Sequence, residues 1–123
     1  MAVKWLDEPE DHDYQAAADY LTMVAEPVAV DKTVDALRTA KPVYRKAKDI
    51  LRAARLALLP ASNVHVASDL KSVADGKKLS PILLVRGDGA RQLEIADGYH
   101  RVCASYITDE NTDIPCHLVS WQA

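Results

Sequence analysis

Apolar residues in the first half of the chain recur every three or four positions, which is the period of an amphipathic helix. This pattern predicts three helices, over residues 14–25, 31–40 and 42–59. Asp31 has the side chain of a helix N-cap, and Pro42 suits the first position of the third helix. We therefore expect the first half to be a helical region.

The pattern changes in the second half, where apolar residues run continuously or alternate with polar ones. Residues 81–86 are apolar through their centre, which is typical of a strand buried on both faces. Gly87-Asp88-Gly89 predicts a hairpin turn into a strand over residues 91–96. The other expected elements are a short strand, a short helix, a longer helix and a closing strand, over residues 63–66, 69–75, 99–107 and 114–119.

Length favours a single domain over residues 1–123. Either half alone, at about 60 residues, would have a marginal core, so we expect one merged core. In this arrangement the helical region 1–60 packs on a small mixed sheet formed by region 61–123. The predicted fold class is therefore α+β.

Charge and cysteine content argue against several classes of function. The formal net charge of −3 is not that of a protein that binds polyanions by bulk charge. Cys103 and Cys116 lack the spacing of a paired motif, and no second His or Cys stands at metal spacing from His65, so we expect reduced cysteines and no metal site. The sequence has no apolar signal core and no membrane-spanning run, so we expect a cytoplasmic protein that does not bind a membrane.

The strongest candidate site is the turn that begins at Asp97, where a strand is expected to pass directly into a helix. Asp97-Gly98 ends the strand, because Gly98 can adopt backbone angles that are closed to other residues. His100 and Arg101 then fall in the first helical turn, where free N–H groups and the helix dipole favour an anion. In another interpretation, Arg101 simply pairs with a nearby carboxylate such as Asp97, and His100 caps a loop.

An ordered set of signals around this turn resembles a known fold. In chain order the set is a short helix, Gly76, Pro81-Ile82, a hairpin, Asp97-Gly98-Tyr99-His100-Arg101, Ala104 and Ile114-Pro115. With this order, residues 68–119 resemble the domain shared by ParB-type partition proteins and sulfiredoxins. The resemblance implies the fold of that family, with nucleotide phosphates bound at the strand–turn–helix.

The turn departs from both branches of this family. Partition proteins carry Gly-Glu-Arg-Arg-x-Arg-Ala here, a pattern that Gly98 and Arg101 fit. Tyr99 stands in place of the Glu, and His100 and Cys103 stand in place of arginines. Sulfiredoxins carry Gly-Gly-Cys-His-Arg, and Tyr99 replaces the reactive Cys. The departures argue against CTP hydrolysis and against sulfinic acid reduction.

The leading hypothesis is a domain that binds a nucleotide or another phosphate-bearing ligand at this turn. The resemblance implies a nucleoside di- or triphosphate with Mg²⁺. Nucleotide-dependent phosphotransfer or hydrolysis would also need a base, for which Asp97 is the candidate. The expected ligand-binding residues are those of the turn and two from the opposite wall, namely Gly98, Tyr99, His100, Arg101, Ser72 and Lys78.

A second hypothesis uses the basic side of the third predicted helix. Arg45, Lys48, Arg52 and Arg55 are spaced three and four residues apart, so one helix would present them on one face. Such a face suits the DNA backbone or an acidic protein partner of a non-catalytic regulator. The same residues also fit a solvated face, or a face paired with the acidic N-terminal segment.

A third hypothesis is a scaffold that keeps the fold with an empty anion site. The helical half is also expected to expose more apolar surface than a small sheet covers, which would favour a homodimer.

Overall fold

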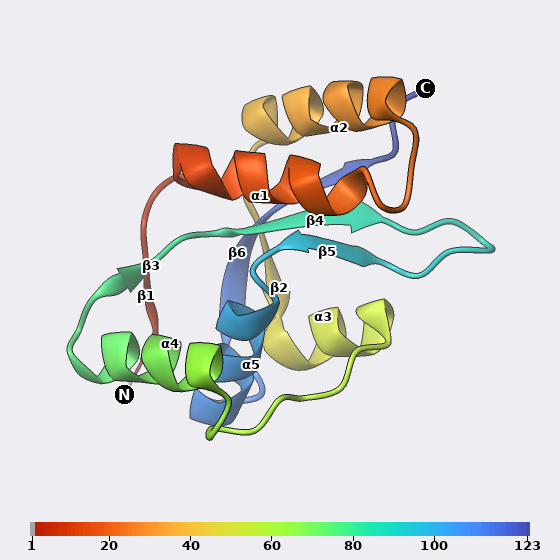
Figure 1. The fold of residues 1–123 in the computed structure, drawn as a ribbon. Helices are drawn as coiled ribbons and strands as arrows, with labels where there is room; N and C mark the ends of the chain where they lie inside the picture. Colours follow the sequence, from red (N-terminus) through yellow and green to blue (C-terminus); the bar gives the residue numbers. More distant parts are fainter. Residues whose placement is uncertain (1) are drawn as a thin grey trace.

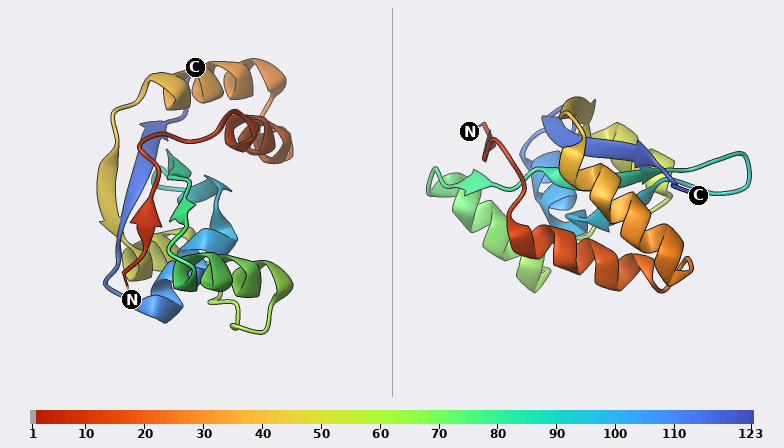
Figure 2. Two further views of the ribbon diagram at one scale, coloured as in Figure 1. Left: turned by 90° about the vertical axis from the view of Figure 1, so that its left-hand side faces the viewer. Right: turned by 90° about the horizontal axis from the view of Figure 1, so that it is seen from above.

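The computed structural model describes residues 2–123, and a four-stranded sheet lies at its centre with helices on both faces (Figures 1 and 2). The strands lie in the order β2-β6-β4-β5, with β4 parallel to β6 and the other pairs antiparallel. Their bounds are Val43–Lys46 for β2, Asp113–Ser120 for β6, Ile82–Arg86 for β4 and Glu94–Asp97 for β5. Helices and a mixed sheet confirm the α+β class.

The helices form two layers, and β4 contributes side chains to both. Helices α1 (Asp11–Leu21) and α2 (Pro27–Thr39) cover one face, where Leu83 and Val85 point. Helices α3 (Ala47–Ala54), α4 (Val64–Ala74) and α5 (Tyr99–Thr108) cover the other, where Ile82 and Leu84 point. The strand is therefore buried on both faces, as its continuous apolar run predicts.

The helix predicted over residues 42–59 is wrong, because its first part is strand β2. Val43 and Tyr44 are strand formers that follow Pro42, and β2 pairs with β6 through partners such as Val43 and Cys116. Helix α3 then runs from Ala47 to Ala54 and is followed by Arg55, which has a left-handed φ of 57°. The long helix is thus divided into a strand and a helix of eight residues.

Other boundaries also differ from the sequence prediction. Helix α1 begins at Asp11 and ends at Leu21, whereas residues 14–25 were expected, and β5 begins at Glu94 rather than at residue 91. Helix α2 begins at Pro27 rather than at Asp31, since proline fits the first turn of a helix. The strand expected at residues 63–66 is wrong, because Asn63 is the N-cap of α4 and accepts hydrogen bonds from the backbone N–H groups of His65 and Val66. This correction moves His65 onto a helix.

The chain also forms a small parallel pair that the sequence did not indicate. Strand β1 (Lys4–Trp5) pairs with β3 (Lys78–Leu79), and Trp5 packs against the core. The helix after Gly98 and the closing strand lie within a few residues of their predicted bounds. Among residues 2–123, no helix has both the length and the apolar character needed to cross a membrane.

Candidate functional site

The turn at Gly98 joins β5 to α5 and depends on the absence of a side chain. Gly98 has a φ of 114°, which a residue with a side chain rarely adopts. A Cβ atom there would lie 2.4 Å from Cδ1 of Ile82, on the neighbouring strand β4. The glycine therefore lets the first turn of α5 pack directly on the sheet, as the Asp-Gly pair predicts.

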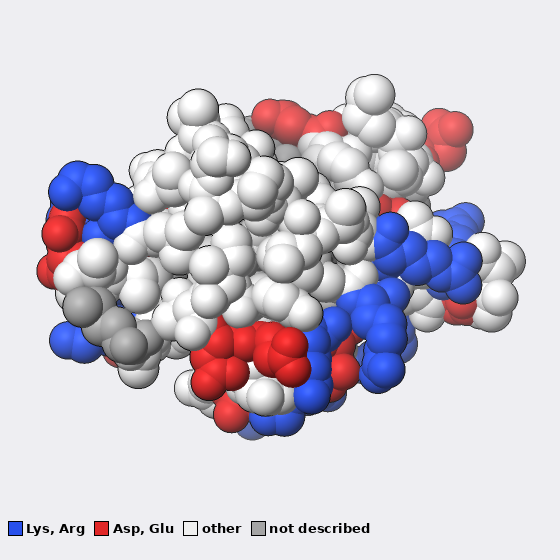
Figure 3. Space-filling model, turned by 90° about the horizontal axis from the view of Figure 1, so that it is seen from below, with Lys and Arg blue, Asp and Glu red and all other residues white. Residues whose placement is uncertain are grey.

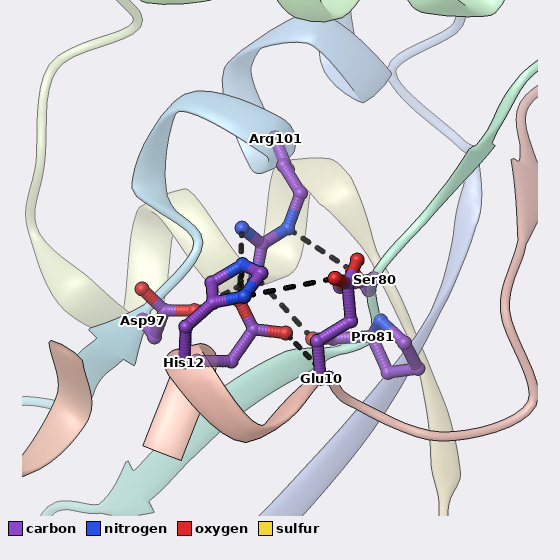
Figure 4. A network of polar contacts seen from close by, with 7 residues as sticks. Glu10, His12, Ser80, Pro81, Asp97 and Arg101 are labelled. Atoms are coloured by element: carbon purple, nitrogen blue, oxygen red, sulfur yellow. Dashed lines mark hydrogen bonds and ion pairs between the residues drawn. The ribbon is translucent and has the colours of Figure 1, made fainter. Parts of the chain in front are cut away.

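Arg101 occupies the centre of a polar network next to this turn (Figure 4). Its Nη2 donates to Oδ2 of Asp97 at 3.0 Å, and its Nε donates to the backbone carbonyl of Ser80 at 3.0 Å. Its Nη1 lies 3.9 Å from a carboxylate oxygen of Asp13 in α1. With 17% of its side chain exposed, Arg101 ties together α1, α5 and the ends of two strands. The structure thus shows the ion pair with Asp97 that the sequence left open.

The acidic N-terminal segment completes this network, which the sequence did not indicate. Asp13 is 2% exposed, and its Oδ2 accepts a hydrogen bond from the backbone N–H of Glu10 at 2.8 Å. The Glu10 carboxylate in turn accepts a hydrogen bond from the Ser80 hydroxyl at 3.1 Å (Figure 4). These contacts anchor the start of α1 beside the turn.

A pocket of about 240 Å³ lies between α4 and the N-terminus of α5, and we call it the α4–α5 pocket. Two imidazole rings, those of His65 and His100, stand at its side with centroids 4.7 Å apart. No side chain within residues 2–123 caps the N-terminus of α5. The residues that line the pocket are His65, Ser68, Asp69, Asp97, Gly98, His100 and Arg101.

Burial dominates the electrostatics of this pocket. It raises the pKa of Asp97 to about 6, against the opposing effect of Arg101, and it also raises the pKa of Asp69. Burial and the neighbouring His65 lower the pKa of His100. The carboxyl groups are therefore neutralised more readily than usual, whereas His100 is mainly neutral at pH 7.

The structure brings together some of the predicted ligand-binding residues and separates others. Gly98, His100 and Arg101 line the α4–α5 pocket with Asp97, whereas Ser72 and Lys78 are not among its lining residues. Tyr99 is also outside the lining. Its hydroxyl donates to the backbone carbonyl of Ala57, and its ring lies 5.7 Å from that of His100.

Three pocket residues were missed because α4 was predicted too short. His65, Ser68 and Asp69 are spaced at i, i+3 and i+4, which places them on one face of a helix. These three residues form the side of the pocket opposite the Gly98 turn, where Ser72 and Lys78 were expected. Had Asn63 been recognised as an N-cap, this spacing would have indicated them.

Among residues 2–123, no group of three or more His, Cys, Asp or Glu side chains is arranged to hold a metal ion. Cys103 and Cys116 are free and buried, and both belong to the core.

The basic residues of the second hypothesis do not form a helical face. Arg45 lies in β2, Lys48 and Arg52 lie in α3, and Arg55 follows the end of that helix. Lys48 and Arg52 line a surface pocket of about 300 Å³ together with Asp49. The helical spacing that linked the four cations is therefore broken.

Comparisons with protein families, curated proteins and solved structures gave no match to this chain.

Proposed function

We propose that this chain binds the phosphate group of a small ligand in the α4–α5 pocket, with a nucleoside di- or triphosphate as the leading candidate. The observation that carries the proposal is the uncapped N-terminus of α5, which opens beside a pocket lined by two histidines. Backbone N–H groups at such an end, together with the helix dipole, favour an anion. The resemblance to ParB-type proteins and sulfiredoxins supports the same location.

The roles of the side chains differ from those expected from the sequence. His100, His65 and Ser68 are the proposed side-chain donors, because they line the pocket. Arg101 is proposed to support the site, since its donors are already directed at Asp97 and at backbone carbonyls. A pocket of 240 Å³ is small for a ligand site. The proposal therefore places a phosphate inside and the rest of the ligand outside.

Binding of Mg²⁺ and catalytic turnover are proposed separately from phosphate binding. Mg²⁺ is commonly bound by phosphates and one or two carboxylates, and Asp69 is the carboxylate here that Arg101 does not occupy. Asp97 remains the proposed base for phosphotransfer, since a pKa of about 6 suits proton exchange near neutral pH. Turnover that is unchanged in Asp97→Asn would remove it from that role, whereas lost turnover with retained binding would support it.

The test of binding is a thermal-shift and calorimetry series with pyrophosphate, ADP and ATP, with and without Mg²⁺. A ligand that binds only the folded state raises the melting temperature. We expect His100→Ala to weaken binding by about tenfold, the effect of losing one charge-assisted hydrogen bond. Lys41→Ala is the control, because Lys41 is exposed and lies outside the pocket. Absence of any shift, or equal loss in both variants, would contradict the proposal.

The alternative of a DNA or protein partner for Arg45, Lys48, Arg52 and Arg55 stays a prediction with weaker support, because these residues do not lie along the face of one helix. Three of them converge with other arginines on a concave site instead.

A further inference from the structure

A second pocket, of about 480 Å³, lies between α3 and the connection from β4 to β5, and we call it the arginine pocket. Five of the seven arginines of the chain line it, and none of the eight lysines does. These arginines are Arg45, Arg52, Arg55, Arg86 and Arg91. They come from β2, α3, the end of β4 and the following connection, so the fold collects them from segments far apart in the sequence.

The charge in this pocket is opposite to that of the whole chain. Two carboxylates, Asp49 and Asp88, stand among the five arginines, which leaves an excess of three positive charges in a protein of net charge −3. Lys and Arg accordingly gather on the side of the molecule where α3 and the β4–β5 connection lie, next to a broad uncharged area (Figure 3). The arginine pocket is therefore locally positive, although the chain as a whole is negative.

Most of these arginines lack a carboxylate partner. Within residues 2–123, Arg45, Arg55 and Arg86 form no ion pair. Arg52 lies 3.3 Å from Asp49 and Arg91 lies 4.0 Å from Asp88, and between 48% and 84% of each of these side chains is exposed. Such exposed pairs contribute little to stability and are easily exchanged for a bound anion.

The floor and walls of the pocket are apolar and fixed by packing. Ile50 and Leu84 belong to the buried core, and Leu93 packs against it at the edge. The backbone N–H of Leu93 donates to the carbonyl of Ala53 in α3 at 3.1 Å, which ties the two walls together. The cations therefore surround an apolar base.

The connection that carries Arg86 and Arg91 is also held in place. The Asp88 carboxylate accepts hydrogen bonds from the backbone N–H groups of Ala90 and Arg91, at 2.9 and 3.0 Å. A Cβ atom on Gly87 would lie 2.2 Å from the carbonyl oxygen of Arg91, so the glycine allows the two sides of the connection to touch. Both arginines are thus presented by a folded turn.

Arg55 stands at a position where glycine would be easier for the backbone. It is the one non-glycine among residues 2–123 with a positive φ, and it follows the last turn of α3. Helices that end in this conformation usually carry glycine there. Arginine at this position gives up the easier backbone conformation of glycine but places a guanidinium group at the pocket.

We propose that the arginine pocket binds a small organic anion that carries two or more phosphate or carboxylate groups on an apolar scaffold. Arginine recognises both groups with two parallel hydrogen bonds, which lysine cannot do. The volume is within the range of small-molecule sites, and the arginines converge on a concavity instead of following a long face as DNA would require. This site is separate from the α4–α5 pocket and does not depend on it.

The test uses fluorescence anisotropy of pyranine, an aromatic trisulfonate, at low salt. We expect saturable binding that is at least about tenfold weaker in Arg55→Gln/Arg86→Gln. The control Lys41→Gln/Lys77→Gln removes the same charge from exposed positions outside the pocket and is expected to bind normally. No binding by the wild type, or equal weakening in both double variants, would overturn the proposal.

Competition then identifies the ligand chemistry. Displacement by fructose 1,6-bisphosphate but not by citrate would assign a phosphate ligand, and the reverse would assign a carboxylate ligand. Tighter competition by a short DNA duplex than by either small anion would overturn the small-molecule proposal. His100→Ala is expected to leave pyranine binding unchanged, so this site and the α4–α5 pocket can fail independently.

Two further variants separate recognition by arginine from general charge and from stability. Arg55→Lys/Arg86→Lys keeps the charge, and we expect binding to weaken because the paired hydrogen bonds are lost. Wild-type affinity in this variant would overturn the proposed arginine recognition. Arg55→Gly is expected to weaken pyranine binding while the melting temperature rises, since glycine suits the backbone there. Retained affinity in Arg55→Gly would exclude Arg55 from the site.

Discussion

The ion pair between Asp97 and Arg101 is expected to make stability depend on pH in a direction opposite to that of most salt bridges. Burial of Asp97, 17% of whose side chain is exposed, raises its pKa from 3.8 to about 6 despite the guanidinium 3.0 Å away. A difference of about two pKa units between the folded and unfolded states corresponds to about 3 kcal/mol. Folding is therefore less favourable by about that amount when the Asp97 carboxyl group is ionised than when it is protonated.

The direction of this pH dependence follows from the stronger proton binding of the folded state. Because the pKa of Asp97 is higher in the folded protein, its contribution to stability is fully present below about pH 4 and is lost as the pH rises through about 6. Asp97→Asn has nearly the same shape and no titrating group. We expect the free energy of unfolding of the wild type, relative to the variant, to fall by up to about 3 kcal/mol between pH 4 and pH 7.5.

The assay is urea unfolding of the wild type and Asp97→Asn at several pH values, followed by tryptophan fluorescence. Asp7→Asn, at an exposed position, is the matched control and is expected to show no such trend. The reasoning would be refuted if Asp97→Asn were more destabilising at pH 7.5 than at pH 4. That result would mean that attraction to Arg101 outweighs burial.

Four other predictions concern the turn, the helix end, the proposed anion site and the apolar surface. Gly98→Ala is expected to lower the free energy of unfolding by about 3 kcal/mol in urea, because φ is positive and a Cβ atom would clash; a loss below about 1 kcal/mol would contradict the packing described. Arg55→Gly is expected to raise the free energy of unfolding by about 1 kcal/mol, because glycine adopts the left-handed conformation without strain. A clear decrease would show that the Arg55 side chain stabilises the fold. Sulfate, used as a probe for the α4–α5 pocket, is expected to bind more tightly as the pH falls from about 8 to about 6. Over this range His100 gains a proton while the carboxyl groups of Asp69 and Asp97 lose their charge. Sulfate binding that does not depend on pH would count against this site. Met23 and Val28 are highly exposed near the junction of α1 and α2, so Val28→Lys is expected to dissociate a homodimer in size-exclusion chromatography with light scattering; a wild type that is monomeric at all concentrations would remove the homodimer prediction.

The part of the fold that the sequence predicted best is the part set by local signals. The apolar run of β4 and the Asp97-Gly98 turn are each signalled by a few adjacent residues. The tight turn predicted at Gly87-Asp88-Gly89 is instead a connection over residues 87–93. The strand β2 shows the opposite case. It pairs with β6, about 70 residues later in the chain, and helical periodicity over residues 42–59 carries no trace of that partner.

In the candidate site too, residues close together in the sequence were predicted, whereas residues brought in from other parts of the chain were not. Gly98, His100 and Arg101 were identified because they share one turn. Asp13 lies near the other end of the chain, so its approach to Arg101 follows only from the packing of α1 on the sheet. His65 was missed because alternating valines around it imitated a strand, although Asn63 caps a helix there.

The measurement that tests the central claim most directly is a titration of ¹⁵N-labelled protein with pyrophosphate, followed by amide chemical shifts. We expect saturable shifts centred on the backbone N–H groups of Tyr99, His100 and Arg101, with smaller changes at His65 and Ser68. These shifts are expected to be reduced in His100→Ala at the same ligand concentrations. Shifts confined to the arginine pocket, or no shifts at all, would contradict the claim that the N-terminus of α5 binds phosphate.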